Sequence, residues 1–588
     1  MTTREGSRLV DVAREGATSR APRAPRRGFR WGQVWGSGTW RRPTWRWLAA
    51  LVALSALANL VVLLLQARSF IRSLYLNADN ANAFVLPALR DHVPAGAVVN
   101  LGDHPWYEPW WYMRATAGLP HYHQLWEIAP IVLGLLGIVA VAACAWRALG
   151  ALAGLLCGAV LVAVSETLRD DLYAPEAHGL VVLHLGVLCG ALLLVLAWAR
   201  AKRLTPTRLL LLGVPFVLFT GAGLTDQLLL VSGLGPFVLA PLLCWWRLRT
   251  RVWLAVTGFA VGTAVLSGLL ALELAQAMQE QHVVHAPFPI SFVATGAIVG
   301  GFENLFAALL ALGGGSFLGG PVSGENLFAF LAGVLVLFAL MFVVRALWHW
   351  VHRPASRAAA STARDVAPPA PGLPARDAEP PARELFIAFW GLVFVCVVAA
   401  FVLTQLSGES GNTRYLIGAW AALAALLGIL VTSPPARAAL LVGVAAFGAL
   451  NVRAELAGGV PPVGPAPGLR IAGEIERFAA AHGASVGYSG YWDSAPVTWE
   501  THERVQINPI EPCGAGAGEC VFYGNQISSW YTPRPHTHTF LLTDSRPGDP
   551  LAVPLPPAGF GQPIAGESLG EGFTIFVYGR DIASSVSP

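Results

Sequence analysis

The stretch WLAALVALSALANLVVLLLQ, residues 47–66, contains no charged side chain. Its length matches the roughly 20 apolar residues that a membrane-spanning helix needs. Arg41, Arg42 and Arg46 precede it, and arginine is enriched in cytoplasmic flanks of such helices. The stretch is therefore predicted to be a first spanning helix with a cytoplasmic N-terminus, which places residues 67–127 in an external loop.

The composition extends this prediction along the chain. Of the 588 residues, 55% are hydrophobic and 13% are charged, whereas soluble domains carry about 25% charged residues. About eleven spanning helices are predicted from windowed hydropathy. After the first they lie near residues 128–145, 149–165, 180–198, 208–224, 227–246, 252–275, 326–347, 385–405, 415–432 and 437–452. The predicted location is the plasma membrane, with the lipid bilayer as a partner.

Alternating these helices places most arginines in cytoplasmic loops and most acids and histidines in external loops, and it places the C-terminus outside. Because topology accounts for the arginine clusters, the net charge of +4 indicates no nucleic-acid partner. Lys202 is the only lysine, a bias typical of a GC-rich, actinobacterial-looking genome. Residues 286–320 are apolar but interrupted by Pro287, Pro289 and three consecutive glycines, which favours a re-entrant or interfacial helix.

Three regions follow from these patterns. Residues 1–44 are predicted to be a disordered basic cytoplasmic tail. Residues 45–456 form the transmembrane domain, which includes a cytoplasmic linker over 350–384 that is rich in Pro, Ala and Arg. Residues 457–588 alternate helical and strand patterns and are predicted to form a small external α/β domain. The patterns place a helix at 469–482 and strands at 485–488, 504–508, 537–543 and 573–578.

Cysteines divide between the two larger regions. Five lie in apolar runs and behave as small buried hydrophobes. Cys513 and Cys520 flank a Gly/Ala-rich loop of the C-terminal region. An external location predicts a disulfide between them, and free thiols or a metal pair are the alternatives.

The first external loop concentrates the side chains that could carry chemistry. It contains SLYLNADNAN, residues 73–82, and NLGDHPWYEPWWYMR, residues 100–114. Carboxylates, indoles and an arginine gather there outside the hydrocarbon. A later external segment, GNTRYL at residues 411–416, leads into a span, and His178 begins the span that follows the second external loop.

This arrangement resembles the GT-C integral-membrane glycosyltransferases, such as protein O-mannosyltransferases and mycobacterial arabinosyltransferases. In that superfamily an acidic residue of the first external loop serves the reaction, and Asp79 occupies this place. Arg414 and Tyr415 look like an Arg-Tyr motif of these proteins. The chain departs from protein mannosyltransferases, which carry an adjacent Asp-Glu pair where this chain has Asp79 and Asn80. The departure concerns the acceptor class.

The resemblance implies an inverting sugar transfer from a polyprenyl-phosphate donor to an external glycan, lipid or protein. Such a transfer needs a base for the acceptor hydroxyl, and a carboxylate suits this role. Asp79 is the candidate base, and a helix N-cap is its structural alternative. Asp103, in Gly-Asp-His-Pro, is either a turn residue or an acceptor contact.

The leaving lipid phosphate calls for a fixed cation, and arginine binds phosphate through paired hydrogen bonds. Arg414 is the first candidate, with headgroup snorkelling as the alternative. Arg114 is the second, with an ion pair to Glu108 or Glu127 as the alternative. His178 is predicted to bind the phosphate or the sugar, or else to end a helix.

Aromatic clusters supply flat apolar faces on which a sugar ring could lie. The predicted sugar site of the first loop consists of Trp106, Tyr107, Trp110, Trp111 and Tyr112, with the sugar hydroxyls bonded to Glu108 or Asp103. An interfacial aromatic belt explains the same composition. In the C-terminal region the predicted acceptor contacts, with packing as the alternative, are Tyr491, Trp492, Trp530 and Tyr531.

Cofactors are not required by these patterns. Glu166, Asp170 and Asp171 together with Asp79 could hold a divalent cation, although exposed loop acids are ordinarily solvated. No metal site is predicted. A transporter or flippase of lipid-linked sugars is a rival function, but transporters place ionisable residues inside their spans, and here the spans are nearly free of them. A non-catalytic glycan- or lipid-binding relative is the third alternative.

Overall fold

Contacts in a computed structural model group Trp47–Pro588 into one compact unit, separate from Met1–Arg46. The predicted basic tail, except for its last residue Thr44, and most of the predicted cytoplasmic linker lie outside the described residues. The structure describes residues 44–75, 77–92, 94–102, 107–163, 165–173, 178–224, 226–285, 290–317, 323–352, 380–408, 412–457, 467–513, 518–547 and 551–587.

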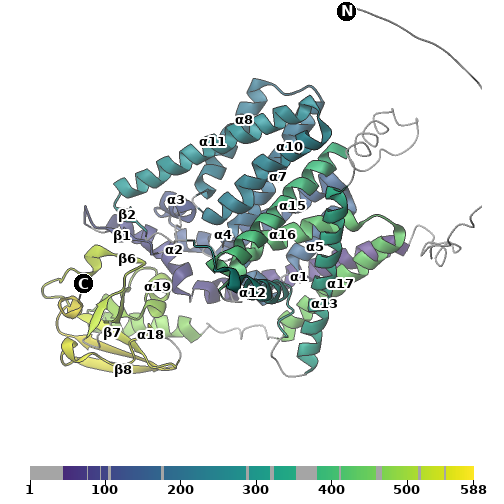
Figure 1. Cartoon of the computed structure of the whole chain (residues 1–588). Helices are drawn as coiled ribbons and strands as arrows, with labels where there is room; N and C mark the ends of the chain where they lie inside the picture. Colours follow the sequence, from purple (N-terminus) through teal and green to yellow (C-terminus); the bar gives the residue numbers. More distant parts are fainter. Residues whose placement is uncertain are drawn as a thin grey trace, which may run out of the picture. The chain divides into compact units, whose positions relative to one another are not determined.

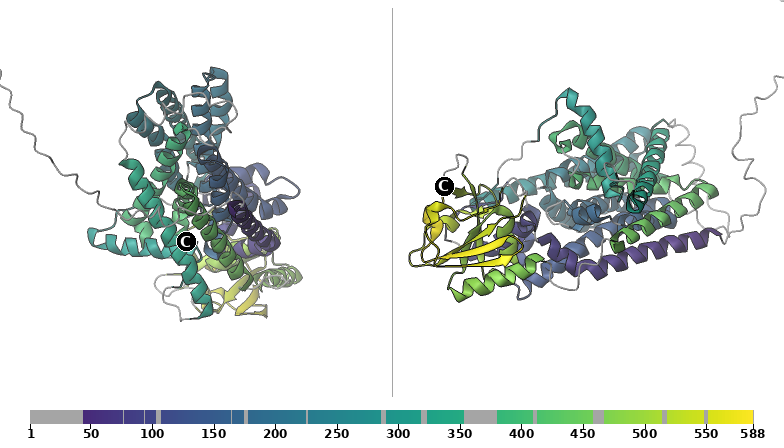
Figure 2. Two further views of the ribbon diagram at one scale, coloured as in Figure 1. Left: turned by 90° about the vertical axis from the view of Figure 1, so that its right-hand side faces the viewer. Right: turned by 90° about the horizontal axis from the view of Figure 1, so that it is seen from below.

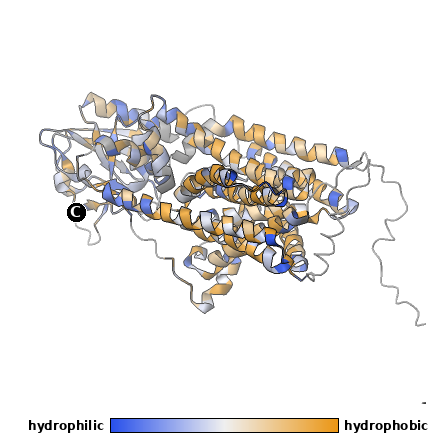
Figure 3. Cartoon of the chain, turned by 90° about the horizontal axis from the view of Figure 1, so that it is seen from above, coloured by the Kyte–Doolittle hydropathy of each residue, from blue (hydrophilic) through white to orange (hydrophobic). Residues whose placement is uncertain are grey.

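Eleven helical segments in the described ranges are long and apolar enough to cross a membrane. This confirms a multi-pass α-helical protein, and the apolar helices stand out from the more polar C-terminal region in Figure 3. The segments lie in α1 (Thr44–Tyr75), α4 (Tyr122–Leu149), α7 (Leu180–Arg200), α8 (Pro206–Gly223), η3 with α10 (Leu230–Leu234, Gly235–Leu248), α11 (Arg251–Glu280), η4 with α12 (Thr295–Ala297, Ile298–Leu312), α13 (Gly324–Val351), α15 (Pro380–Leu403), η6 with α16 and η7 (Thr413–Leu416, Ile417–Leu426, Leu427–Leu430) and α17 (Pro434–Ala457) (Figure 1).

The two ends of the helix bundle are distinguished by their contacts. At one end, Arg247 of α10 donates to the carbonyls of Trp350 and Val351 in α13, and Trp350 donates to Glu384 of α15. We call this the arginine end. At the other end, His123 of α4 pairs with Glu503 of the C-terminal region at 2.9 Å. We call this the domain end.

Helix α12 differs from the other candidate spans because both of its flanks lie at the domain end. Upstream, Phe292 bridges to Thr404, which follows the domain end of α15. Downstream, the hydroxyl of Ser165 donates to the carbonyl of Leu312 at 2.8 Å, and α13 then runs from Gly324 toward the arginine end. These contacts favour the predicted interfacial helix.

The predicted span at 149–165 is shorter than expected. Helix α5 covers Ala151–Val162, 12 residues, or about 18 Å at 1.5 Å per residue. The next helix, α6 (Glu166–Tyr173), is bent from it by 97°. Gly150, with φ of 100°, makes the turn that folds α5 back along α4. If α5 crosses and α12 does not, the number of crossings stays at eleven, as the sequence predicts.

The C-terminal region is an α/β domain, as predicted. Its sheet has the strand order β5-β4-β3-β7-β9-β8, in which β3 pairs in parallel with both β4 and β7. Helix α18 (Pro467–Ala481) precedes the sheet, and α19 (Tyr491–Glu500) connects β3 to β4. The strands are β3 (Val486–Ser489), β4 (Gln506–Pro512), β5 (Glu519–Val521), β7 (Thr539–Asp544), β8 (Ala565–Gly570) and β9 (Phe573–Tyr578).

Loop elements of the membrane domain bind this α/β domain. Helices α2 (Ala78–Leu89) and α3 (Tyr107–Thr116) follow α1, and α2 packs on α19 through Phe84 and Trp499, whose ring centroids are 5.0 Å apart. A second sheet of β1 (Val99–Asn100), β2 (Val283–Val284) and β6 (Gln526–Ile527) joins three distant segments. Figure 2 shows the domain at one end of the long helices.

Candidate functional site

Asp79 lies where the first external loop meets the C-terminal domain. It is in the first turn of α2, and the side chain of Asn77 accepts the Asp79 backbone N–H at 2.8 Å. Asn77 is therefore the N-cap, and the structural alternative for Asp79 is wrong. The Asp79 carboxylate instead accepts a hydrogen bond from the hydroxyl of Tyr491, which is 412 positions away.

The hydroxyl of Tyr491 is held on its other side by Asn525, whose amide donates to it at 2.6 Å. The Tyr491 ring stacks on Phe522 with centroids 4.3 Å apart and an angle of 21°. It also meets the ring of Trp492 edge to face at 4.9 Å. We call Asp79, Tyr491 and Asn525 the Asp79 centre.

A second polar group, which we call the Arg414 cluster, comprises Asp171, His178, Asp226, Arg414 and Tyr415. The imidazole of His178 lies 2.6 Å from the Asp226 carboxylate and 5.4 Å, centroid to centroid, from the Tyr415 ring. The guanidinium of Arg414 lies over the same ring at 5.3 Å. Three of the predicted donor-site residues therefore lie close together, and their binding of a donor remains a prediction.

Local backbone geometry places these side chains. His178 adopts a left-handed conformation with φ of 63° just before α7 begins, which costs a non-glycine residue energy. Asp226 caps the short helix α9 (Gln227–Leu229) by accepting the Leu228 N–H at 2.8 Å. The ion pair with Asp226 therefore anchors a histidine in an otherwise unfavourable turn.

Electrostatics differ between the two carboxylates of the cluster. Burial raises the pKa of Asp171 to about 6, although the Thr413 hydroxyl and the positive charges of Arg414 and His178 act in the opposite direction. Burial would also raise the pKa of Asp226, but the charge and hydrogen bond of His178 outweigh it and lower that pKa. The cluster thus combines a guanidinium and an imidazole with two carboxylates whose pKa values are shifted in opposite directions.

A chain of contacts places both groups at the domain end. Phe70, near the end of α1, packs on Tyr173 of α6 with ring centroids 6.2 Å apart. Tyr173 lies two residues after Asp171 of the Arg414 cluster, and α1 ends at Tyr75, shortly before Asp79. The two groups are thus carried by neighbouring elements. The sequence also predicts that Asp79 and Arg414 face one outward-opening pocket and lie about 10 Å apart, a sugar's width, and this stays a prediction.

Other predicted residues of the first loop are less defined. Arg114 donates to the carbonyl of Pro87 in α2 at 3.3 Å, a contact that joins α3 to α2. Asp103 and Trp106 lie outside the described residues. Tyr107 and Glu108 begin α3, but their side chains are not described. The predicted sugar site of this loop therefore stays a prediction.

The predicted acceptor residues of the C-terminal domain separate into two kinds. Trp530 is 3% exposed, and its carbonyl accepts from Asn508 at 3.1 Å. The Tyr531 hydroxyl donates to the carbonyl of Pro509. Packing, the alternative for both, is what these contacts favour. Tyr491 contacts Asp79, Trp492 meets the Tyr491 ring, and both stay predicted acceptor contacts.

Metal ligands are not assembled by the acidic loop. Asp170 lies 3.6 Å from Arg169, which also pairs with Glu455 at 2.7 Å, and Asp79 and Asp171 have the partners given above. No group of three or more His, Cys, Asp or Glu side chains that could hold a metal ion is found in the described residues. Cys513 and Cys520 form a disulfide at the edge strand β5.

Two polar residues of these sites were not predicted to take part. Asp226 is one of the acids that the predicted topology places in external loops, and its position between two predicted spans is a usable signal. Asn525 is one amide among the loop residues of the C-terminal domain, and nothing in its local sequence marks it. Its role follows from the position of Tyr491 alone.

The fold and the site define a multi-pass membrane protein with polar centres and an α/β domain at one end of its helices. No protein-family model and no curated protein matches the chain. Among solved structures, it is similar to the oligosaccharyltransferase of Archaeoglobus fulgidus in its apo form, with 12% identity, a TM-score of 0.41, and coverage of 86% of this chain and 70% of the other.

Two further structures of that protein show the same distant likeness. AglB with an inhibitory peptide and a dolichol-phosphate has 11% identity and a TM-score of 0.38 over 81% of this chain and 64% of its own. The complex with zinc and sulfate has 11% identity and a TM-score of 0.38 over 78% and 62%. This chain thus spans less than two thirds of the length of these two. At such values the likeness carries no functional argument.

Proposed function

We propose that the chain is a membrane glycosyltransferase of the GT-C type. It transfers a sugar from a polyprenyl-phosphate donor to an acceptor hydroxyl on the external side of the plasma membrane, with inversion at the anomeric carbon. Asp79 is the proposed base, and Arg414, Tyr415 and His178 are the proposed contacts of the donor. The acceptor is a cell-envelope glycan, a lipid or a protein.

In the proposed reaction the acceptor oxygen attacks the anomeric carbon while Asp79 takes the hydroxyl proton. The bond between the anomeric carbon and the phosphate oxygen breaks, and its electron pair leaves with the lipid phosphate. Charge-assisted hydrogen bonds from a guanidinium and an imidazole stabilise such a leaving group. The side chains of the two groups supply both requirements.

The observation that carries this proposal is the presence of two different polar centres on neighbouring elements of the domain end. One presents a carboxylate whose described partner is a neutral hydroxyl. The other presents Arg414 and His178, with Asp171 and Asp226 nearby. A transferase of lipid-phosphate sugars needs a base and a phosphate site side by side, whereas the rival transporter has no need of a base.

Purified protein in proteoliposomes with radiolabelled decaprenyl-phosphate hexoses and pentoses tests the proposal. We expect release of decaprenyl phosphate and transfer of label to envelope glycan, lipid or peptide acceptors added outside. Movement of the intact donor across the bilayer without release of decaprenyl phosphate would support the transporter instead. Binding without either event would support a non-catalytic protein.

A further inference from the structure

Tyr491 belongs to the C-terminal domain, yet its hydroxyl binds the proposed base of the membrane domain. Asn525 donates to the Tyr491 oxygen at 2.6 Å. Because the phenol oxygen is already accepting, the hydroxyl proton is directed to the Asp79 carboxylate, which can only accept when charged. The network therefore has one direction, from amide to phenol to carboxylate.

The Tyr491 side chain is rigid in this position. It is 4% exposed and stacked on Phe522. Gly490, the residue before it, has no room for a side chain, because a Cβ there would lie 2.4 Å from the Leu551 carbonyl oxygen. The start of α19 is thus held by the backbone of Leu551 at Gly490 and by the ring of Phe522 at Tyr491.

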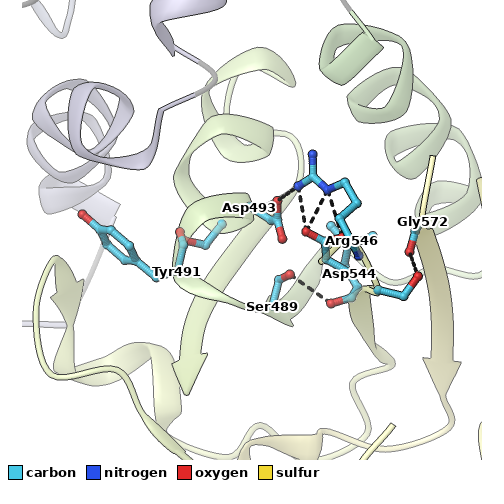
Figure 4. A network of polar contacts seen from close by, with 9 residues as sticks. Ser489, Tyr491, Asp493, Asp544, Arg546 and Gly572 are labelled. Carbon is cyan, nitrogen blue, oxygen red and sulfur yellow. Dashed lines mark hydrogen bonds and ion pairs between the residues drawn. The ribbon is translucent and has the colours of Figure 1, made fainter. Parts of the chain in front are cut away.

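A network on the other face of α19 holds the same turn. Arg546 bridges Asp493, at 3.1 Å, and Asp544, at 2.7 Å. Asp493 lies two residues after Tyr491, and Asp544 ends the neighbouring strand β7. Figure 4 shows Tyr491 pointing away from this network, so the ion pairs anchor the helix and leave the phenol directed elsewhere.

Asp79 is held in place by contacts of its own helix, α2. Its backbone N–H is bound by Asn77, and α2 packs on α19 through Phe84 and Trp499. One carboxylate oxygen, Oδ1, takes the Tyr491 hydrogen bond. Within the described part of the chain, no hydrogen bond is recorded to the second oxygen, Oδ2.

We infer that Tyr491 is a positioning residue for the base, and that the C-terminal domain thereby completes the catalytic centre. This inference rests on the proposed function. Tyr491 holds Oδ1, so that Oδ2 faces the acceptor hydroxyl and takes its proton. Asn525 acts through Tyr491 by fixing the direction of the phenol hydrogen bond. Neither residue contacts the reacting atoms.

Full-length Tyr491→Phe in the proteoliposome assay tests the inference. This substitution keeps the stacked ring and removes the donor to Asp79. We expect kcat to fall about 10-fold to 100-fold, the effect of losing a hydrogen bond to a charged group, while KM for the decaprenyl-phosphate sugar stays unchanged. Tyr523→Phe is the matched control, because the Tyr523 side chain is 65% exposed, and it should leave both constants unchanged.

Asn525→Ala and the double variant separate positioning from a structural role. If Asn525 acts through Tyr491, the double variant should be no slower than Tyr491→Phe alone. Additive losses would show that Asn525 acts independently of Tyr491 and would overturn the role given to Asn525. A lower thermal midpoint with a raised KM in Tyr491→Phe would show that the contact only holds the domains together and would overturn the inference. So would wild-type kcat in Tyr491→Phe while Asp79→Asn is inactive. Full activity of Asp79→Asn would instead contradict the proposed function, in which Asp79 is the base.

Discussion

The Asp79 centre and the Arg414 cluster lie at the same end of the molecule but are built differently. In the Asp79 centre the carboxylate accepts from a phenol, which itself accepts from an amide, and both of these groups are uncharged. In the Arg414 cluster, arginine and histidine face two carboxylates. An uncharged donor orients a carboxylate and stabilises its charged form less than a cation does, so it weakens the carboxylate less as a base.

The Arg414 cluster, the proposed donor site, needs charged rather than uncharged partners. A site for a lipid phosphate needs cations, and cations gathered in a half-buried site repel one another unless anions accompany them. Asp171 and Asp226 supply that balance. Under the proposed function the carboxylates therefore serve two purposes, Asp79 as the reacting group and Asp171 and Asp226 as counter-ions, and their partners distinguish them.

The Asp79 centre and the Arg414 cluster should both face the external side of the membrane. Reporter fusions test this topology, because each fusion is either active or inactive. We expect an alkaline phosphatase fusion after Val452, at the domain end of α17, to be active. A fusion after Arg251, at the arginine end, should be inactive because the arginine clusters mark the cytoplasmic side. The reverse pattern would place both centres in the cytoplasm.

Replacement of the base should have the largest effect on activity. Asp79→Asn keeps the size of the side chain and its place beside Tyr491 but removes the basic carboxylate. We expect the rate of sugar transfer to fall at least 100-fold, since general bases contribute about 10²-fold to 10⁴-fold.

The control for Asp79→Asn is Glu571→Gln, a carboxylate removed from an exposed ion pair with Arg470. It should retain the wild-type rate. Both variants should keep the wild-type thermal midpoint. Normal turnover by Asp79→Asn would assign that residue a purely structural contact.

Loss of the arginine should affect donor binding rather than the chemical step alone. We expect Arg414→Ala to raise KM for the decaprenyl-phosphate sugar about 10-fold or more, because a bound phosphate loses hydrogen bonds worth about 1.5–3 kcal/mol. Arg437→Ala, an exposed arginine at the opposite end of the bundle, is the control. An unchanged KM in Arg414→Ala would indicate that its guanidinium only meets lipid headgroups.

The smallest expected effect concerns the counter-ion. With a pKa of about 6, Asp171 is mostly charged at neutral pH and gains a proton as the pH falls through that value. The neutral Asp171 then no longer competes with the donor phosphate for Arg414. The KM for the donor should therefore fall severalfold as the pH falls from about 7.5 to 5. Asp171→Asn should give the lower KM at every pH. A parallel pH dependence in this variant would exclude Asp171 as its source.

The sequence alone determined the multi-pass membrane class and the α/β character of the C-terminal domain. These depend on local transfer free energy and periodicity, which a single segment contains. The strand predicted at 573–578 is β9 itself, and the helix predicted at 469–482 is α18 within two residues. The span predicted at 149–165 is too long, because hydropathy does not reveal that the helix ends at Val162 and that the chain bends there.

Only the tertiary structure decided which polar groups meet. The sequence singled out Asp79, Arg414, Tyr415 and His178 by residue type and by their places at span ends. It contained no sign that Tyr491 would reach Asp79 across 412 positions, because that contact depends on how α19 packs against α2. The same applies to the N-cap of α2, which is the structural alternative predicted for Asp79 and which Asn77 occupies in the structure. Hydropathy is a property of a segment, whereas a hydrogen-bond partner is a property of the packed chain.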